Sequence, residues 1–333
     1  MKEIRLDYLQ NPPLNLELSK LFLPNYHFDS IADKNNASLI DSKRDSIKAF
    51  FKKDFALPFS FTAGGFAEVF LQFKKIYFLP TLHYEIRRAL QVVSTFVEVI
   101  KLDSTQAFLE CDNTLDSAKK DEILMILPLV NEDIFSLNQI PKLRNATTCL
   151  DISYALALGL EIVQEADIFV INAMSLGLIR DFGLIISHKA YTANIYKKGV
   201  SEAIFMAIKE RRDIFKNANK DENLHFFEAL KSHFGKDISL FCDDFMPHTL
   251  PLRLRYINTR YLIEHLYLDN VFIHASQDCS LGLIKPSHTL LSMGFSPLVA
   301  RELCAVSFYE ICDINLVAEK IFESYKMIRL MEF

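Results

Sequence analysis

The sequence lacks the features that would place it in several special classes. It has no tryptophan, and its six cysteines are scattered without the CxxC spacing of a zinc site or a disulfide framework. No apolar run reaches the roughly 18 residues that a membrane span needs, and residues 1–7 hold no long apolar stretch typical of a signal peptide. The 37 basic and 42 acidic residues give a net charge of −5 without a basic stripe. We therefore expect a cytoplasmic protein that binds neither nucleic acid nor a membrane, and no metal site.

Half of the 333 residues are hydrophobic, which allows a sizeable core, and the length suits one large domain plus a smaller one. Up to residue 215, short apolar runs alternate with amphipathic stretches. Such alternation predicts βαβ units and a mostly parallel sheet. The strands are expected at 76–80, 96–102, 122–130, 147–152, 167–172 and 182–187, and the helices at 39–55, 83–94 and 201–215.

A polar segment at 217–223 precedes a change in composition. Beyond it the apolar runs are short and mixed, which predicts a second, smaller α+β domain. Its strands are expected at 238–242, 252–257 and 271–275, and its helices near 259–268, 297–308 and 314–330.

The most informative pattern lies between Asp167 and Lys189, where an aspartate, an apolar run, Met174-Ser175-Leu176-Gly177 and Asp181-Phe182-Gly183 follow one another. Without a gap, this segment resembles the stretch of cysteine desulfurases and class V aminotransferases that reads VD, apolar run, SxHK, G, KGxGALY. In that family the lysine forms a Schiff base with pyridoxal 5′-phosphate (PLP). The match places Ser175 at the lysine. A hydroxyl cannot form an imine, so the resemblance implies the family's fold without its defining lysine.

The resemblance extends toward the N-terminus. Residues 61–66, Phe-Thr-Ala-Gly-Gly-Phe, look like the family's FTSGATE turn, which holds the cofactor phosphate at a helix N-terminus. Gly64 and Gly65 remain, whereas Phe66 replaces the threonine. His83 is similar to the histidine that stacks on the pyridine ring in the family. The alternatives are a plain tight turn for the glycines and a helix-capping role for His83.

Two further positions match cofactor contacts. The segment 150–153 resembles HVDAxQ and puts Asp151 at the carboxylate that pairs with the pyridine nitrogen. A buried carboxylate at a strand end is costly unless it is paired, which independently favours a site role for Asp151. Asn131 is similar to the asparagine that bonds the cofactor's phenolic oxygen. Its alternative role is that of a turn residue after a strand.

The segment 275–288 looks like the desulfurase loop SGSACSSGxLEPSH, and it puts Cys279 at the persulfide-forming cysteine. The adjacent Asp278 should raise the pKa of this thiol, and an inert packed cysteine is the alternative. The segment 304–310 aligns with IRFSLGR, where Ala305 and Glu310 replace both arginines. The first of these arginines clamps the substrate carboxylate in the family, so the resemblance implies loss of that clamp.

Taken together, the resemblance implies PLP transferase fold type I. A large three-layer α/β/α domain would span residues 14–230, and a small α+β domain would combine residues 1–13 and 231–333. We expect a homodimer and a catalytically degenerate protein, with PLP bound non-covalently at best. It would act as a binding, regulatory or sulfur-accepting partner, its own partner being a desulfurase or a sulfur-acceptor protein. One alternative is an active PLP enzyme that uses Lys189, otherwise a surface lysine after an edge strand. Another is a structural protein whose pocket is filled by Phe66 and Met174.

Overall fold

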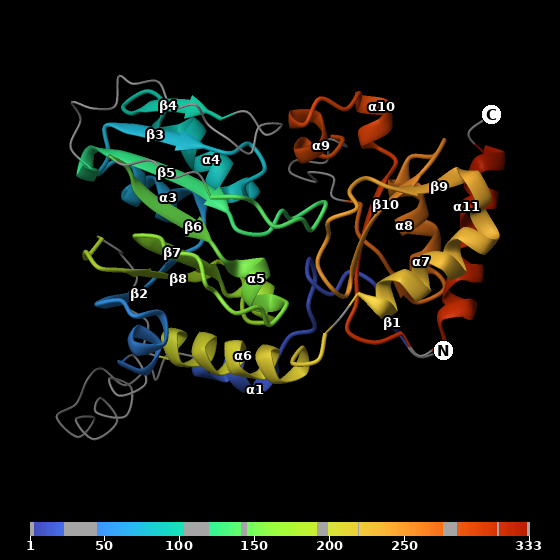
Figure 1. Cartoon of the computed structure of the whole chain (residues 1–333), viewed down its shortest axis with the longest axis horizontal. Coiled ribbons are helices and arrows are strands. Elements are labelled where there is room, and N and C mark those ends of the chain that lie inside the picture. Colours follow the sequence, from blue (N-terminus) through green and yellow to red (C-terminus); the bar gives the residue numbers. More distant parts are fainter. Residues whose placement is uncertain are drawn as a thin grey trace. The chain divides into compact units, whose positions relative to one another are not determined.

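The computed structural model describes residues 3–22, 45–102, 120–140, 145–191, 199–218, 220–275, 285–311 and 313–331 (Figure 1). The chain divides into two compact units. The large unit comprises Pro12–Leu129 and Gln139–Lys216, and the small unit comprises Met1–Asn11, Val130–Asn138 and Asn217–Phe333. The sequence-based limits, 14–230 for the large domain and 1–13 with 231–333 for the small one, remain a prediction.

The large unit is built on a seven-stranded sheet with the order β2-β8-β7-β6-β5-β3-β4. Only β8 runs antiparallel to its neighbours β2 and β7, and the other pairs are parallel. This mostly parallel sheet confirms the predicted α/β class. In sheet order the strands are β2 (Phe55–Ser60), β8 (Phe182–Ser187), β7 (Ile168–Asn172), β6 (Thr147–Asp151), β5 (Ile123–Pro128), β3 (Lys75–Phe78) and β4 (Glu98–Lys101).

Helices flank this sheet. The longer ones are α3 (Ala63–Phe70), α4 (Tyr84–Val93) and α6 (Val200–Ile214), and α6 packs against β2 and β8. Every residue of β5 and of β7 is buried, as expected for central strands of a mostly parallel sheet that is covered on both faces. The shorter helical segments are α1 (Leu16–Ser19), α5 (Ser153–Ala157) and the 3₁₀ turns η1 (Lys20–Phe22), η4 (Lys120–Glu122) and η5 (Met174–Leu176).

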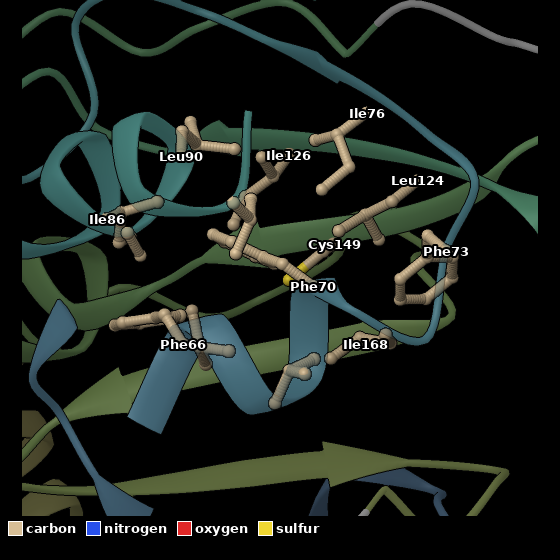
Figure 2. Close-up of a cluster of buried hydrophobic side chains, with 14 of the residues drawn as sticks. Phe66, Phe70, Phe73, Ile76, Ile86, Leu90, Leu124, Ile126, Cys149 and Ile168 are labelled. Atoms are coloured by element: carbon tan, nitrogen blue, oxygen red, sulfur yellow. The ribbon is translucent and has the colours of Figure 1, made fainter. Parts of the chain in front are cut away.

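One core cluster joins α3 and α4 to the sheet. Figure 2 shows Phe66 and Phe70 of α3 and Ile86 and Leu90 of α4 close to side chains of the central strands. The spacing of the buried α4 residues, at 86, 89, 90 and 93, is that of one helix face. Because both helices are fixed by this core, their amino-terminal turns are fixed as well.

The small unit is α+β, as predicted. It contains the antiparallel sheet β12-β10-β9 and the parallel pair β1-β11, through which the N-terminal strand joins the C-terminal part of the chain. Its strands are β1 (Ile4–Arg5), β9 (Ile238–Leu240), β10 (Thr249–Leu254), β11 (Val271–Phe272) and β12 (Leu303–Ser307). Its helices are α7 (Asp221–Phe234), α8 (Thr259–Tyr267), α9 (His288–Ser292), α10 (Pro297–Ala300) and α11 (Ile314–Met331), with the 3₁₀ turn η6 (Gly235–Asp237).

Several predicted elements need correction. The helix expected at 297–308 is wrong: α10 ends at Ala300, and Leu303–Ser307 form β12, a fully buried strand that periodicity alone cannot tell from a buried helix. The helix expected at 39–55 is described at 45–51, and Phe55 already begins β2, a strand that was not predicted. The polar segment 217–223 overlaps the start of α7. Within the described ranges, no helix is both long and apolar enough to cross a membrane.

Candidate functional site

Ser175 lies just beyond the carboxyl end of β7, in the turn η5. The turn is closed by Gly177, which has φ +78° and donates its N–H to the carbonyl of Met174 (2.9 Å). A Cβ on Gly177 would approach the Pro13 carbonyl oxygen to 2.7 Å, so only glycine fits there. Ser175 itself is 5% exposed. The residue that matches the family's lysine is therefore a buried hydroxyl at the carboxyl edge of the sheet.

Asp151 ends the neighbouring strand β6, and its partner across the ladder is Val170 of β7. Its Oδ1 accepts hydrogen bonds from both the N–H (3.0 Å) and the hydroxyl of Ser153. Burial raises the pKa of Asp151 to about 6, and the Ser153 hydrogen bonds oppose that rise. A buried carboxyl at this edge is what the resemblance implies for the pyridine-nitrogen partner.

A hydrogen-bond chain connects Asp151 to the Ser175 turn. The Ser153 hydroxyl donates to Asp151 and accepts from the N–H of Asn172 (2.7 Å), and the Asn172 Oδ1 accepts from the N–H of Met174 (3.0 Å). Adjacent parallel strands thus bring the two predicted positions to one edge of the sheet.

Lys189 lies at the other edge. β8 runs antiparallel to β7, so Gly183 pairs with Asn172 whereas Ser187 pairs with Ile168. Lys189 follows Ser187, and its Nζ is 3.6 Å from the Asp121 carboxylate in an exposed ion pair. The length of β7, about 13 Å at roughly 3.3 Å per residue, separates the two edges. The prediction that Lys189 follows an edge strand is wrong, since β8 lies between β2 and β7.

The turn that matches the family's phosphate-binding segment begins α3, with Thr62 as its N-cap. A Cβ on Gly65 would lie 2.0 Å from the Ser60 carbonyl oxygen, whereas a Cβ on Gly64 would meet only the Thr62 hydroxyl at 3.9 Å. Gly65 is therefore required by packing, and Gly64 is not. Phe66 is 1% exposed and belongs to the core between α3 and α4.

His83 caps the next helix, α4. Its Nδ1 accepts a hydrogen bond from the Glu85 N–H (3.3 Å), and its ring meets the Phe61 ring edge-on, with the centroids 5.2 Å apart. This capping geometry matches the alternative expected for His83. Its role against a cofactor ring stays a prediction.

Glu85 is the residue that the sequence analysis missed. Its Oε2 accepts a hydrogen bond from the N–H of Ala63 at 2.6 Å, at the amino end of α3. Helix N-termini carry partial positive charge and attract anions, so a carboxylate is stabilised there. In the sequence, an acidic residue in the first turn of α4 indicates only the start of α4. The contact with α3, 22 residues away in sequence, has no local signature.

Asn131 belongs to the small unit, where it is 2% exposed. Its Oδ1 accepts from the N–H groups of Asp133 (2.9 Å) and Ile134 (3.2 Å), which is the turn-stabilising alternative. In the same unit the Ser287 hydroxyl donates to the Asp133 carboxylate and caps α9. Cys279 lies outside the described residues, so its role as the persulfide-forming cysteine stays a prediction.

Burial disfavours the thiolate form of the described cysteines, and the thiolate is the nucleophilic form. Burial raises the pKa of Cys149 well above its ordinary value and that of Cys304 to about 12. Burial also raises the pKa of Cys242, whose S–H donates to the Asp244 carbonyl (3.3 Å). Among the residues with described positions, no three His, Cys, Asp or Glu side chains are grouped as metal ligands.

The replaced clamp positions lie in the small unit as well. Ala305 is fully buried in β12, and Glu310 is exposed. Nearby, the Ser307 hydroxyl donates to Gln10 Oε1 (2.8 Å) and accepts from the Leu9 N–H (2.9 Å). This buried network fastens the N-terminal segment onto β12.

The mostly parallel seven-stranded sheet flanked by helices is an α/β fold that this chain shares with solved NifS-like structures. Solved structures similar to this chain include a NifS-like protein from Rickettsia africae ESF-5, with a TM-score of 0.73 and 14% identity over 98% of this chain and 99% of that one. A second NifS-like protein has a TM-score of 0.72 and 11% identity over 99% of both chains. The cysteine desulfurase CsdA from Escherichia coli, in its S-sulfonic acid form, has a TM-score of 0.63 and 10% identity over 99% of this chain and 95% of that one.

No protein-family model and no curated protein sequence matches the chain. At identities this low the structural likeness establishes the fold. The chain has the fold of NifS-like proteins, which confirms the fold inferred from the Asp167–Lys189 segment.

Proposed function

We propose that this chain is a cysteine desulfurase-like protein without imine chemistry, acting as a binding, regulatory or sulfur-accepting partner. One observation carries the proposal. The buried hydroxyl of Ser175 lies at the carboxyl edge beside Asp151, while Lys189 lies at the opposite edge of the sheet. Because the strand directions separate the two edges, Lys189 cannot replace the missing amine without refolding of β8.

The residues that the resemblance assigns to PLP do not fit the cofactor as a set. Asp151 retains the buried acid, but the amine is absent at Ser175, and a carboxylate rests on the helix turn assigned to the phosphate. PLP would be held non-covalently at best. We therefore derive no reaction through PLP for this chain.

Sulfur acceptance requires only an accessible, partly ionised thiol. We propose Cys279 as that thiol. Its thiolate would attack the outer sulfur of a persulfide on a desulfurase, forming the Cys279 persulfide and releasing the donor's cysteine thiolate. The high pKa values of Cys149 and Cys304 argue against those two cysteines as acceptors.

The proposal includes a homodimer in the cytoplasm. Isologous dimers are the commonest oligomers, and loss of cofactor chemistry does not by itself remove a subunit interface. Light scattering at micromolar concentration should give twice the 38.3 kDa chain mass. A monomer mass alone would contradict this part of the proposal.

The absence of imine chemistry is tested by absorbance and by trapping. We expect the purified protein to be colourless, and to remain free of a visible-edge band after PLP has been added and the unbound PLP removed by gel filtration. Borohydride reduction followed by peptide mass spectrometry should give no stoichiometric pyridoxyl-lysine. A stoichiometric adduct at Lys189, or at any other lysine, would favour the alternative of an active PLP enzyme.

A further inference from the structure

The first turn of α3 already has partners within the protein. Such a turn presents N–H groups with no partner inside the helix. Here the Ala63 N–H donates to Glu85 Oε2 (2.6 Å), the Gly65 N–H to the Thr62 hydroxyl (3.4 Å) and the Phe66 N–H to the Thr62 carbonyl (3.0 Å). A phosphate that accepted from the Ala63 or the Gly65 N–H would have to displace the Glu85 carboxylate or the Thr62 hydroxyl.

Glu85 is held in position from two directions. Its N–H donates to the His83 ring, which fixes the start of α4, and the next residue, Ile86, is fully buried. Phe66 and Ile86 belong to one core cluster, and Figure 2 shows them facing one another from α3 and α4. The backbone that carries the carboxylate is therefore anchored by the same core that anchors the helix turn it caps.

The surroundings of Glu85 are unfavourable to a further anion. Asp181 lies beside this turn, because its carbonyl accepts from the Phe61 N–H (3.0 Å). Burial, a hydrogen bond with Glu85 and the negative charges of Glu85 and Asp181 raise the pKa of Tyr84 to about 12, although Arg180 opposes the rise. A phosphate would thus be placed next to a carboxylate that already neutralises the helix end, and juxtaposed like charges are disfavoured.

We propose that Glu85 is a built-in occupant of the anion-binding turn of α3, and that it excludes the phosphate of PLP from this chain. The inference deepens the proposed function, on which it rests for the assignment of the turn. Two residues then oppose PLP binding: Ser175 cannot form the covalent attachment, and the Glu85 carboxylate occupies the turn that would hold the phosphate. Removal of the carboxylate should reopen the Ala63 N–H to an external anion.

The experiment uses pyridoxine 5′-phosphate and pyridoxine, because neither has an aldehyde that could react with surface lysines. Binding of both compounds to the full-length protein is measured by calorimetry. The wild type should show no preference for the phosphorylated form. Glu85→Ala should prefer the phosphorylated form by at least about tenfold, because a like-charge contact is removed. The exposed Glu161 supplies a matched control, and Glu161→Ala should behave like the wild type.

Circular dichroism establishes that each variant is folded, and Glu85→Gln, which keeps the shape and removes the charge, replaces Glu85→Ala if the latter unfolds. A preference of the wild type for the phosphorylated compound would overturn the inference. The inference would also be overturned if a folded variant without the Glu85 charge gained no preference for the phosphorylated compound. Both results leave the proposed absence of imine chemistry standing, because borohydride trapping of a lysine adduct tests that proposal separately.

Discussion

Asp151 accepts two hydrogen bonds on a single oxygen from one residue, Ser153, through its N–H and its hydroxyl. The same hydroxyl accepts from the N–H of Asn172 at 2.7 Å, so it links the ends of β6 and β7. Ser153 therefore connects Asp151, the match to the family's pyridine-nitrogen partner, to the end of the neighbouring strand. This local pairing makes the buried acid tolerable without a ligand.

Ser153→Ala should lower the free energy of unfolding by about 1–3 kcal/mol, because it leaves the buried Asp151 carboxyl and the Asn172 N–H without that hydroxyl. Urea denaturation followed by circular dichroism measures the change. The exposed Ser232, which bonds only the Ala229 carbonyl of its own helix, is the control, and Ser232→Ala should change stability by less than about 0.5 kcal/mol. Equal effects of the two substitutions would mean that the Asp151 network contributes little.

The stability of the protein should depend on the ionisation of Asp151. Its folded-state pKa of about 6 lies above the ordinary 3.8, so the folded protein binds more protons than the unfolded chain between these values. This group therefore makes the folded state less stable as pH rises from about 4 to about 6. The full cost above that window is on the order of 3 kcal/mol, from about 1.4 kcal/mol per pKa unit.

Asp151→Asn removes that titration. We expect the variant to gain stability relative to the wild type at pH 7, and the difference to shrink toward pH 4. Urea midpoints at several pH values measure this difference. Asp243→Asn, at an exposed position, is the control and should leave the pH dependence between about pH 4 and about pH 6 unchanged. A constant difference between the wild type and Asp151→Asn across this range would mean that Asp151 does not titrate there.

The two glycines that begin α3 provide a matched pair. Gly65→Ala should destabilise the protein by more than about 2 kcal/mol, since its Cβ would overlap the Ser60 carbonyl oxygen at 2.0 Å. Gly64→Ala adds the same methyl group where the nearest atom is 3.9 Å away, so its effect should stay within about 1 kcal/mol. Thermal melts of the two variants decide this. Similar losses in both would indicate that the helix turn adapts around a side chain.

The sequence predicted those parts of the fold that depend on local pattern. β8 matches its expected range, and α8 and α11 match to within one residue, because apolar runs and helix faces are readable from spacing. β12 was mistaken for a helix because a run that is buried throughout has no period. No local pattern indicates that Asp151 and Ser175 lie at one edge of the sheet. That expectation came from the family resemblance alone.

The Glu85 contact was out of reach for a different reason. Glu85 begins one helix and caps another, so its role depends on how α3 and α4 pack. The resemblance assigns roles only at positions where the family carries cofactor contacts, and Glu85 is not at one of them. Lys189 illustrates the converse, because its sequence context mimics a motif whereas the direction of β8 places it at the wrong edge.

Restoring the amine at position 175 should be insufficient for cofactor attachment. Ser175→Lys alone should give little pyridoxyl adduct at that position after PLP and borohydride, because Glu85 still opposes the phosphate. Ser175→Lys combined with Glu85→Ala should give at least about tenfold more adduct, measured by peptide mass spectrometry. Ser175→Lys with Glu161→Ala is the control. An equal adduct yield from Ser175→Lys alone and from Ser175→Lys with Glu85→Ala would mean that Glu85 does not exclude the phosphate.

If the protein handles sulfur, Cys279 should receive it from a working desulfurase. Transfer needs neither an imine nor a carboxylate clamp, and the neighbouring Asp278 should slow it by raising the thiol pKa. The measurement is retention of ³⁵S by this protein after incubation with the desulfurase and labelled cysteine. Cys279→Ser should abolish the label, whereas Cys242→Ser, which removes a partly buried thiol of raised pKa, should leave it unchanged. Label that survives Cys279→Ser, or no label in the wild type, would leave Cys279 as a packed thiol and favour a purely structural role.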